Sequence, residues 1–161
     1  MSAATMSPNS VSLRAGCPED LPSILSLLEG ARLPLAGVPD GLSRLVVAEV
    51  GDELVGVAGL ERYGTSALLR SVAVSPRHQG KGIAGAMIQR LLEEAKCDCI
   101  HDVFLRTTTA EGYFPKFGFS PVELSKVPLQ VKDSVEFQGA CPTSAVTMVC
   151  CLDRASDAVN R

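Results

Sequence analysis

The sequence predicts an α/β domain of layered α+β type, in which one mixed central sheet of about six to seven strands carries helices on both faces. Strand-length runs rich in valine and leucine alternate with segments whose apolar residues recur at helical spacing. Hydrophobic residues make up 46% and charged residues 20% of the 161 positions, a balance that supports one folded core. We expect a single domain over residues 11–153, between a disordered tail at 1–10 and a flexible tail at 154–161.

The N-terminal part predicts a strand, a helix and a loop in that order. A short strand is expected at residues 11–14. Pro18 and the two acids after it favour a helix start, because proline fits the first turn and the helix dipole favours negative charge there. One apolar stripe continues this helix to Gly30 and consists of Leu21, Ile24, Leu25 and Leu28. Residues 33–43 contain two prolines and two glycines and predict a loop.

Three strands are expected in close succession. Residues 44–50 and 53–60 are separated only by Gly51 and Asp52, which is the length of a two-residue hairpin turn. A second turn at 62–65 leads to the apolar run 68–74, which predicts a central strand that ends at Ser75-Pro76.

The strongest helical periodicity lies at 82–96, where apolar residues share one face and charged residues occupy the rest. The remaining expected elements are a strand at 102–107, a short helix at 109–117, and strands at 119–123 and 145–152. Pro115 is compatible with the short helix only near its first turn.

Charge and composition argue against several classes of protein. The net charge is −3 and the 15 basic residues are scattered, so we expect no nucleic-acid partner. The apolar runs are far shorter than the roughly 20 residues that span a bilayer, so no membrane association is expected. Residues 1–10 lack the features of a secretion signal, which predicts a cytoplasmic location with the six cysteines reduced. The spacing of the cysteines predicts no metal site, and it does not bring three thiolates together to bind a metalloid such as arsenic.

The most informative segment is a glycine-rich loop that opens the long helix. It consists of Gln79, Gly80, Lys81, Gly82, Ile83 and Ala84. Glycines let the backbone approach a ligand closely, and the unpaired N–H groups of a helix's first turn bind anions, with a pyrophosphate as the natural one. Such turns are also common without any ligand. The loop matches neither the P-loop nor the dinucleotide-binding pattern, so neither ATP nor NAD is indicated.

The spacing Gln79-x-x-Gly82-x-Ala84 resembles the signature of the GNAT superfamily of N-acetyltransferases. Residues 110–119 resemble that family's later helix, which ends in Gly-Phe, and the resemblance extends over residues 11–123. Residues 68–74, 107–111 and 141–145 further resemble the small N-acetyltransferases encoded with arsenic-resistance genes and the acetyltransferase domain of N-acetylglutamate synthases.

The resemblance implies a GNAT fold with a splay between the fourth and fifth strands, and acetyl-CoA as co-substrate. The amides of residues 79–84 would hold the pyrophosphate, and the strand edge at Val72, Ala73 and Val74 would pair with the pantetheine arm. It implies direct attack of the acceptor amine in a ternary complex, with a backbone N–H near Val74 steadying the oxyanion. Homodimers are common in the family, so a homodimer is expected.

The proton of the acceptor amine needs a base, and Glu61 is the first choice, ahead of Glu111 and His78. Each also has a structural explanation, as a solvated strand end, a helix-start acid or a surface histidine. The family often protonates the leaving thiolate with a tyrosine four residues before the glycine of Gly-Phe. That position is Phe114 here, and the nearest tyrosine is Tyr113, a shift of about 100° on a helix.

Arginine suits a substrate carboxylate because its guanidinium pairs with both oxygens at once. Arg70 and Arg106, on neighbouring central strands, are the predicted anchors, with a hydroxyl from Ser144 in the same pocket. Arg70 has the alternatives of facing solvent or pairing with a structural acid. The acceptor implied by the resemblance is a small amino-acid-like molecule, a glutamate analogue such as arsinothricin or phosphinothricin. The alternatives are an acetyltransferase for peptide or protein amines, and a non-catalytic module that senses acetyl-CoA.

Overall fold

The computed structural model describes residues 10–33, 35, 44–108, 110–133 and 145–152. Residues 1–9 of the predicted N-terminal tail, the whole predicted C-terminal tail, most of the predicted loop at 33–43, and Ser144 lie outside these residues.

The described strands form one seven-stranded sheet in the order β1-β2-β3-β4-β5-β7-β6. Their bounds are β1 Val11–Ala15, β2 Arg44–Val50, β3 Glu53–Tyr63, β4 Ser66–Val74, β5 Asp102–Thr107, β6 Ser120–Pro121 and β7 Val146–Cys151. Each neighbouring pair is antiparallel except β4 and β5, which run parallel. A parallel pair needs a long crossover, and helix α3, Ile83–Cys97, supplies it.

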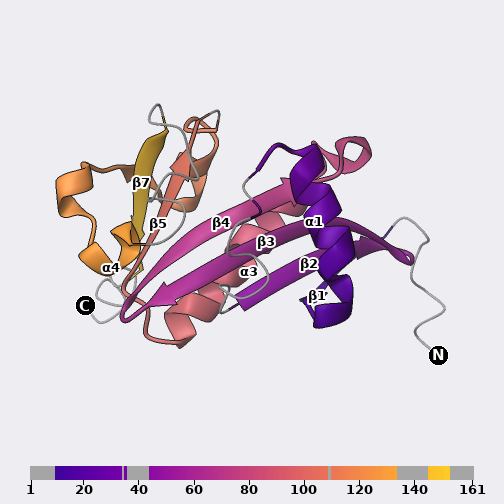
Figure 1. Ribbon diagram of the computed structural model, residues 1–161, viewed down its shortest axis with the longest axis horizontal. Helices are drawn as coiled ribbons and strands as arrows, with labels where there is room; N and C mark the ends of the chain where they lie inside the picture. Colours follow the sequence, from indigo (N-terminus) through magenta and orange to yellow (C-terminus); the bar gives the residue numbers. More distant parts are fainter. Residues whose placement is uncertain (1–9, 34, 36–43, 109, 134–144, 153–161) are drawn as a thin grey trace.

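Helices cover both faces of the sheet (Figure 1). Helix α1, Leu21–Gly30, packs Ile24 and Leu28 against one face. Helix α3 buries Met87, Ile88 and Leu91 on the other face, in the largest apolar cluster. A short helix α4, Leu129–Lys132, encloses a third cluster around Leu68 and Phe104. Side chains alternate along a strand, so Leu68 and its neighbour Leu69 contribute to clusters on opposite faces.

The predicted order of elements is confirmed up to β5, and two later predictions are wrong. The expected helix at 109–117 is only a 3-10 helix, Phe114–Phe117, with Pro115 in its first turn. Its aromatic side chains meet edge to face instead of lining one helical face. The expected strand at 119–123 is reduced to Ser120–Pro121, because the chain turns into a 3-10 helix at Leu124–Lys126. The second hairpin is also tighter than expected, since only Gly64 and Thr65 separate β3 from β4.

No helix among the described residues is long and apolar enough to cross a membrane. In the same residues, no three potential metal-ligating side chains gather at one point. The described cysteines form no disulfide with one another.

Candidate active site

The candidate site lies where β4 separates from β5. Their parallel pairing covers only residues 66–68 of β4 and 102–104 of β5. Just beyond it, β4 contains a β-bulge, in which Ser71 and Val72 together stand opposite Ala58 of β3. A bulge bends its strand, so β4 turns away where its pairing with β5 ends. A splay opens between the two strands as a result.

The direction of the backbone in β4 determines what it offers to the splay. The Ser75 N–H donates to the Val55 carbonyl of β3 at 2.8 Å. Hydrogen-bonding direction alternates along an antiparallel strand, so the N–H groups of Val74 and Val72 point away from β3 and into the splay. Ala73 pairs with Val57 of β3 instead. Of the three residues predicted for this edge, two therefore present their amides to a ligand.

The loop after β4 forms an open cradle of amides at the start of α3. Gly80 and Gly82 have φ angles of +79° and +81°, which L side chains rarely adopt. A Cβ atom at either glycine would have no neighbour within 4 Å, so the space before the loop is open. Among the described residues, no acceptor pairs with the N–H groups of residues 80–85. Six consecutive amides at a helix N-terminus therefore lack an acceptor within the described protein, and such an arrangement fits a diphosphate.

Side chains hold this cradle against the end of β4. The Gln79 side chain donates from Nε2 to the Val74 carbonyl at 3.0 Å. Ser75 Oγ and His78 Nδ1 lie 2.9 Å apart across a single 3-10 turn, Pro76–His78. His78, the third-choice base, is therefore part of the loop's own structure. The glutamine of the motif also has a structural task, which is to fix the cradle to the strand that borders the splay.

Tyr113 lies against the first turn of α3. A Cβ atom built at Gly85 would lie 3.7 Å from the Tyr113 hydroxyl, an ordinary van der Waals distance, so the hydroxyl lies beside this turn. Lys116 Nζ lies 4.3 Å from the centre of the Tyr113 ring. Burial raises the pKa of the Tyr113 hydroxyl, so it keeps its proton at neutral pH. Phe114, which occupies the family's usual tyrosine position, is buried in the core.

The buried charges Glu61 and Arg70 form an ion pair with each other. Arg70 Nη1 lies 3.0 Å from Glu61 Oε2, and the side chains are 0% and 4% exposed. The Tyr63 hydroxyl donates to the other Glu61 oxygen, and Arg70 Nε donates to Ser71 Oγ at 3.2 Å. A structural acid was one of the alternatives predicted for Arg70, and in the structure its partner is the acid Glu61. Glu61 as base stays a prediction, and its carboxylate already accepts from two donors.

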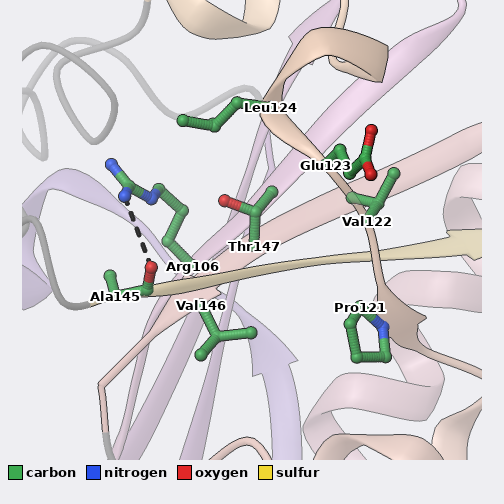
Figure 2. Close-up of a pocket in the computed structure, with 8 residues that line it drawn as sticks. All are labelled: Arg106, Pro121, Val122, Glu123, Leu124, Ala145, Val146 and Thr147. Atoms are coloured by element: carbon green, nitrogen blue, oxygen red, sulfur yellow. Dashed lines mark hydrogen bonds between the residues drawn. The ribbon is translucent and has the colours of Figure 1, made fainter.

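Arg106 contributes to a different feature, an open cavity of about 410 Å³ on β5 and β7. Its walls comprise Arg106, Pro121, Val122, Glu123, Leu124, Ala145, Val146 and Thr147. Figure 2 shows Arg106 and Glu123 on different sides of Thr147, with the Arg106 guanidinium directed at the Ala145 carbonyl, 3.5 Å from Nη2. One positive and one negative group therefore share a cavity with apolar walls. Glu111, the second-choice base, is exposed and does not line it.

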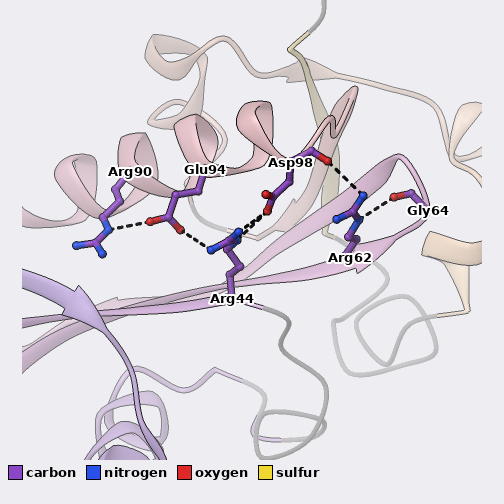
Figure 3. A network of polar contacts seen from close by, with 6 residues as sticks. All are labelled: Arg44, Arg62, Gly64, Arg90, Glu94 and Asp98. Atoms are coloured by element: carbon purple, nitrogen blue, oxygen red, sulfur yellow. Dashed lines mark hydrogen bonds and ion pairs between the residues drawn. The ribbon is translucent and has the colours of Figure 1, made fainter.

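A second cavity, of about 330 Å³, lies at the other end of α3 and has a structural role. Four of its charged residues, Arg44, Arg90, Glu94 and Asp98, are paired with one another (Figure 3). Arg44 at the start of β2 contacts both Glu94 and Asp98, and Arg90 pairs with Glu94 at 3.0 Å. Arg62 of β3 donates to the Asp98 carbonyl at 3.2 Å. The cavity lies far along the helix from the open amides, and we assign it no catalytic role.

Residues 41–121, half of the chain, match the family model described as an acetyltransferase (GNAT) domain. The chain belongs to the GNAT acetyltransferase family. The predicted GNAT fold, with its mixed sheet and its parallel pair at β4 and β5, is confirmed, and so is the prediction of an acyltransferase.

Solved structures share the fold of this GNAT acetyltransferase at low sequence identity. N-acetylglutamate synthase from Neisseria gonorrhoeae, complexed with coenzyme A and N-acetyl-glutamate, matches with a TM-score of 0.77 and 22% identity over 89% of this chain. This chain spans only 35% of that protein. Rv2747 from Mycobacterium tuberculosis, in complex with CoA and NLQ, matches with a TM-score of 0.72 and 24% identity, covering 87% of this chain and 98% of that one.

A third match is the PaiA N-acetyltransferase from Thermoplasma acidophilum in complex with coenzyme A. Its TM-score is 0.67 and its identity 15%, covering 88% of this chain and 99% of that one. At these identities the likeness concerns the fold.

The amide loop and Arg106 stay predictions of the site, and three residues that lie near them were not predicted from the sequence. Tyr63 and Ser71 became visible only with the register of β3 and β4. Glu123 was assigned to a strand, whereas it follows β6 and lines the cavity. The proline at 121 was the one local sign that this strand ends early.

Proposed function

We propose that this GNAT acetyltransferase moves an acetyl group from acetyl-CoA to the amine of a small amino acid that carries a free carboxylate. The observation that carries the proposal is the set of open amides at residues 80–85, set beside the amides of Val72 and Val74 at the splay. The family match and the CoA in three related structures support acetyl-CoA as donor.

The proposed donor site uses the backbone. The open amides from Gly80 to Ala84 hold the pyrophosphate, with Lys81 and Ile83 part of that run, and the splay edge of β4 pairs with the pantetheine arm. The predicted amide of Gln79 already donates to the Pro76 carbonyl at 3.5 Å. The amide of Val74 steadies the negative charge that develops on the carbonyl oxygen. As the neutral amine attacks, a C–N bond forms, the C–S bond breaks and the nitrogen loses its proton. The protonated Tyr113 hydroxyl, beside the first turn of α3, is our choice for the donor to the departing sulfur.

The proposed acceptor site is the cavity over β5 and β7. A free amino acid carries a carboxylate and an amine at a fixed spacing, and Arg106 and Glu123 offer one partner for each. Glu123 is exposed, so its carboxylate can receive the amine proton through water. Ser144, predicted for the same pocket, lies outside the described residues, next to the wall residue Ala145. We assign Arg106, instead of the paired Arg70, to the substrate.

The finer identity of the acceptor is part of the proposal. Two of the related structures contain CoA together with N-acetyl-glutamate or L-arginine, both amino-acid-like molecules. Glutamate analogues such as arsinothricin and phosphinothricin are the acceptors we propose, as in the arsenic-resistance enzymes that the sequence resembles. A homodimer in the cytoplasm also stays a prediction.

The test is thiol release from acetyl-CoA with a panel of acceptors: glutamate, its α-amide, a decarboxylated amine, both antibiotics and a peptide. We expect turnover with the amino acids, and we expect Arg106→Gln to raise their KM about tenfold to a hundredfold, because a charge-assisted contact is lost. The decarboxylated amine should be insensitive to the substitution. Arg90→Gln on the outer side of α3 is the matched control, with no expected effect.

Two outcomes would replace the proposal. Equal turnover of peptide and amino-acid amines would favour a peptide or protein acetyltransferase. Tight binding of acetyl-CoA in calorimetry without turnover of any amine would favour a sensing module.

A further inference from the structure

Ser71 has a backbone conformation that its position does not explain. Its φ angle is +61°, and the other non-glycine residues with positive φ in the described part of the chain are Arg32 and Cys99. Arg32 and Cys99 follow the ends of α1 and α3, where the left-handed conformation closes a helix. Ser71 instead lies inside a strand, at the bulge position where glycine is the usual residue. Something other than local sequence must hold it there.

A buried chain of polar contacts reaches Ser71 from β3. The Tyr63 hydroxyl donates to Glu61, Glu61 pairs with Arg70, and Arg70 Nε donates to Ser71 Oγ. The two charged side chains are almost completely excluded from solvent. A buried ion pair is weak evidence for stability, because desolvation offsets the attraction, but such pairs can select one conformation over another.

The bulge has a direct consequence for the donor site. Ala67 and Leu69 before it, and Val72 and Val74 after it, all pack on the α3 side, whereas Ala73 packs on the α1 side. Strict alternation would have placed residues 71 and 73 on the α3 side. Without the extra residue, Val72 and Val74 would exchange faces and direct their amides into β3.

We propose that Tyr63, Glu61 and Arg70 are positioning residues that hold Ser71 in the left-handed conformation and so direct the amides of Val72 and Val74 into the splay. The role of those amides toward the acetyl donor rests on the function proposed above. The three side chains act through Ser71, and none of them touches a substrate. In this assignment Glu61 is no base and Arg70 is no carboxylate anchor.

The sharpest test compares two substitutions at one residue. Ser71→Ala removes the contact from Arg70 and retains a Cβ that disfavours positive φ, whereas Ser71→Gly loses the same contact but adopts positive φ freely. We expect Ser71→Ala to raise the KM for acetyl-CoA about tenfold, equivalent to ~1.4 kcal/mol, and Ser71→Gly to stay within about twofold of the parent protein. Ser66→Ala is the matched control, because Ser66 is also buried in β4 and bonded to a charged side chain, Asp102, but precedes the bulge.

A second set of variants tests the side chains behind Ser71. Glu61→Gln combined with Arg70→Met removes the ion pair without leaving one charge buried alone. We expect this double variant to raise the KM for acetyl-CoA as Ser71→Ala does. The addition of Ser71→Gly should return the KM to the parent value. The proposal would be overturned if the double variant had a lower kcat, or a higher KM for the acceptor, and the addition of Ser71→Gly did not return these values to those of the parent protein. That outcome would favour direct roles for Glu61 and Arg70.

The backbone itself gives a readout that needs no ligand. Amide hydrogen exchange at Val72 and Val74 should change in Ser71→Ala and not in Ser71→Gly or Ser66→Ala. Equal exchange in all three variants would contradict the positioning role. If the parent protein bound no acetyl-CoA while exchange followed this pattern, the proposed function would fail and the inference about the bulge would stand.

Discussion

The two ends of helix α3 are built in opposite ways. At the N-terminus, the amides of residues 80–85 have no acceptor among the described residues, and the glycines before them face open space. At the C-terminus, Cys99 and Ile100 donate their N–H groups back to the carbonyls of Lys96 and Ala95. This is a Schellman closure, with Cys99 in the left-handed position at φ +65°. Arginines from β2 and β3 then tie the same end to the sheet (Figure 3).

The difference implies that one end of α3 contributes to ligand binding and the other end to the stability of the fold. The open end keeps its hydrogen-bonding capacity and the positive end of the helix dipole available for an anion. The closed end satisfies its own carbonyls and sets arginines beside the negative end of the dipole, which stabilises the helix. Substitutions at the open end should therefore change ligand affinity with little effect on unfolding, and substitutions at the closed end should do the reverse.

The largest expected effect is that of Gly82→Asp at the open end. The new carboxylate repels the phosphates of the ligand. For two phosphate charges at about 5 Å and an effective dielectric constant of about 40, this repulsion weakens binding by roughly 3 kcal/mol. We expect the Kd for acetyl-CoA in calorimetry to rise at least about a hundredfold. Gly82→Asn has the same shape without the charge and tolerates positive φ, so it should retain most of the affinity.

Gly51→Asp provides a second control for this prediction. Gly51 also has positive φ, +61°, and no atom within 4 Å of an added Cβ, but it lies in the β2–β3 turn. Gly51→Asp should leave the Kd for acetyl-CoA unchanged, because Gly51 is not next to the open amides. Equal losses of affinity at both glycines would remove the distinction between the ends of α3.

The open end could be predicted from sequence because its signals are local. Gly80 and Gly82 precede a strongly periodic helix, and both prove to need positive φ. The bulge at Ser71 gave no such signal, because serine does not mark the left-handed conformation. The Glu61–Arg70 pair depends on the register of two strands, which the residue pattern does not specify. The helix expected at 109–117 failed for a related reason, since its aromatic residues pack against one another and α3 instead of following a helical stripe.

A smaller effect is expected from Arg44→Met at the closed end. Arg44 bridges Glu94 and Asp98, but all three side chains are about one-third exposed or more, so solvent weakens the pairs. We expect the free energy of unfolding in urea to fall by about 0.5–1 kcal/mol, and less at high salt. The Kd for acetyl-CoA should stay within about twofold of the parent value. A loss of affinity comparable to that of Gly82→Asp would mean that the two ends are coupled.

The smallest expected effect, and the one of opposite sign, is that of Cys99→Gly. Cys99 is exposed and closes α3 at positive φ, a conformation that costs an L residue about 1 kcal/mol and glycine almost nothing. Part of this gain is offset because glycine gives the unfolded chain more freedom, so a net stabilisation of about 0.5 kcal/mol is expected. For a domain of this size the thermal midpoint should rise by about 1–2 °C. Cys97→Gly, two residues earlier at the last position of α3, should lower it, because there glycine has only the entropic disadvantage. If both glycines lowered the midpoint, the strain at Cys99 would be too small to matter and the closed end would owe its stability to the arginines alone.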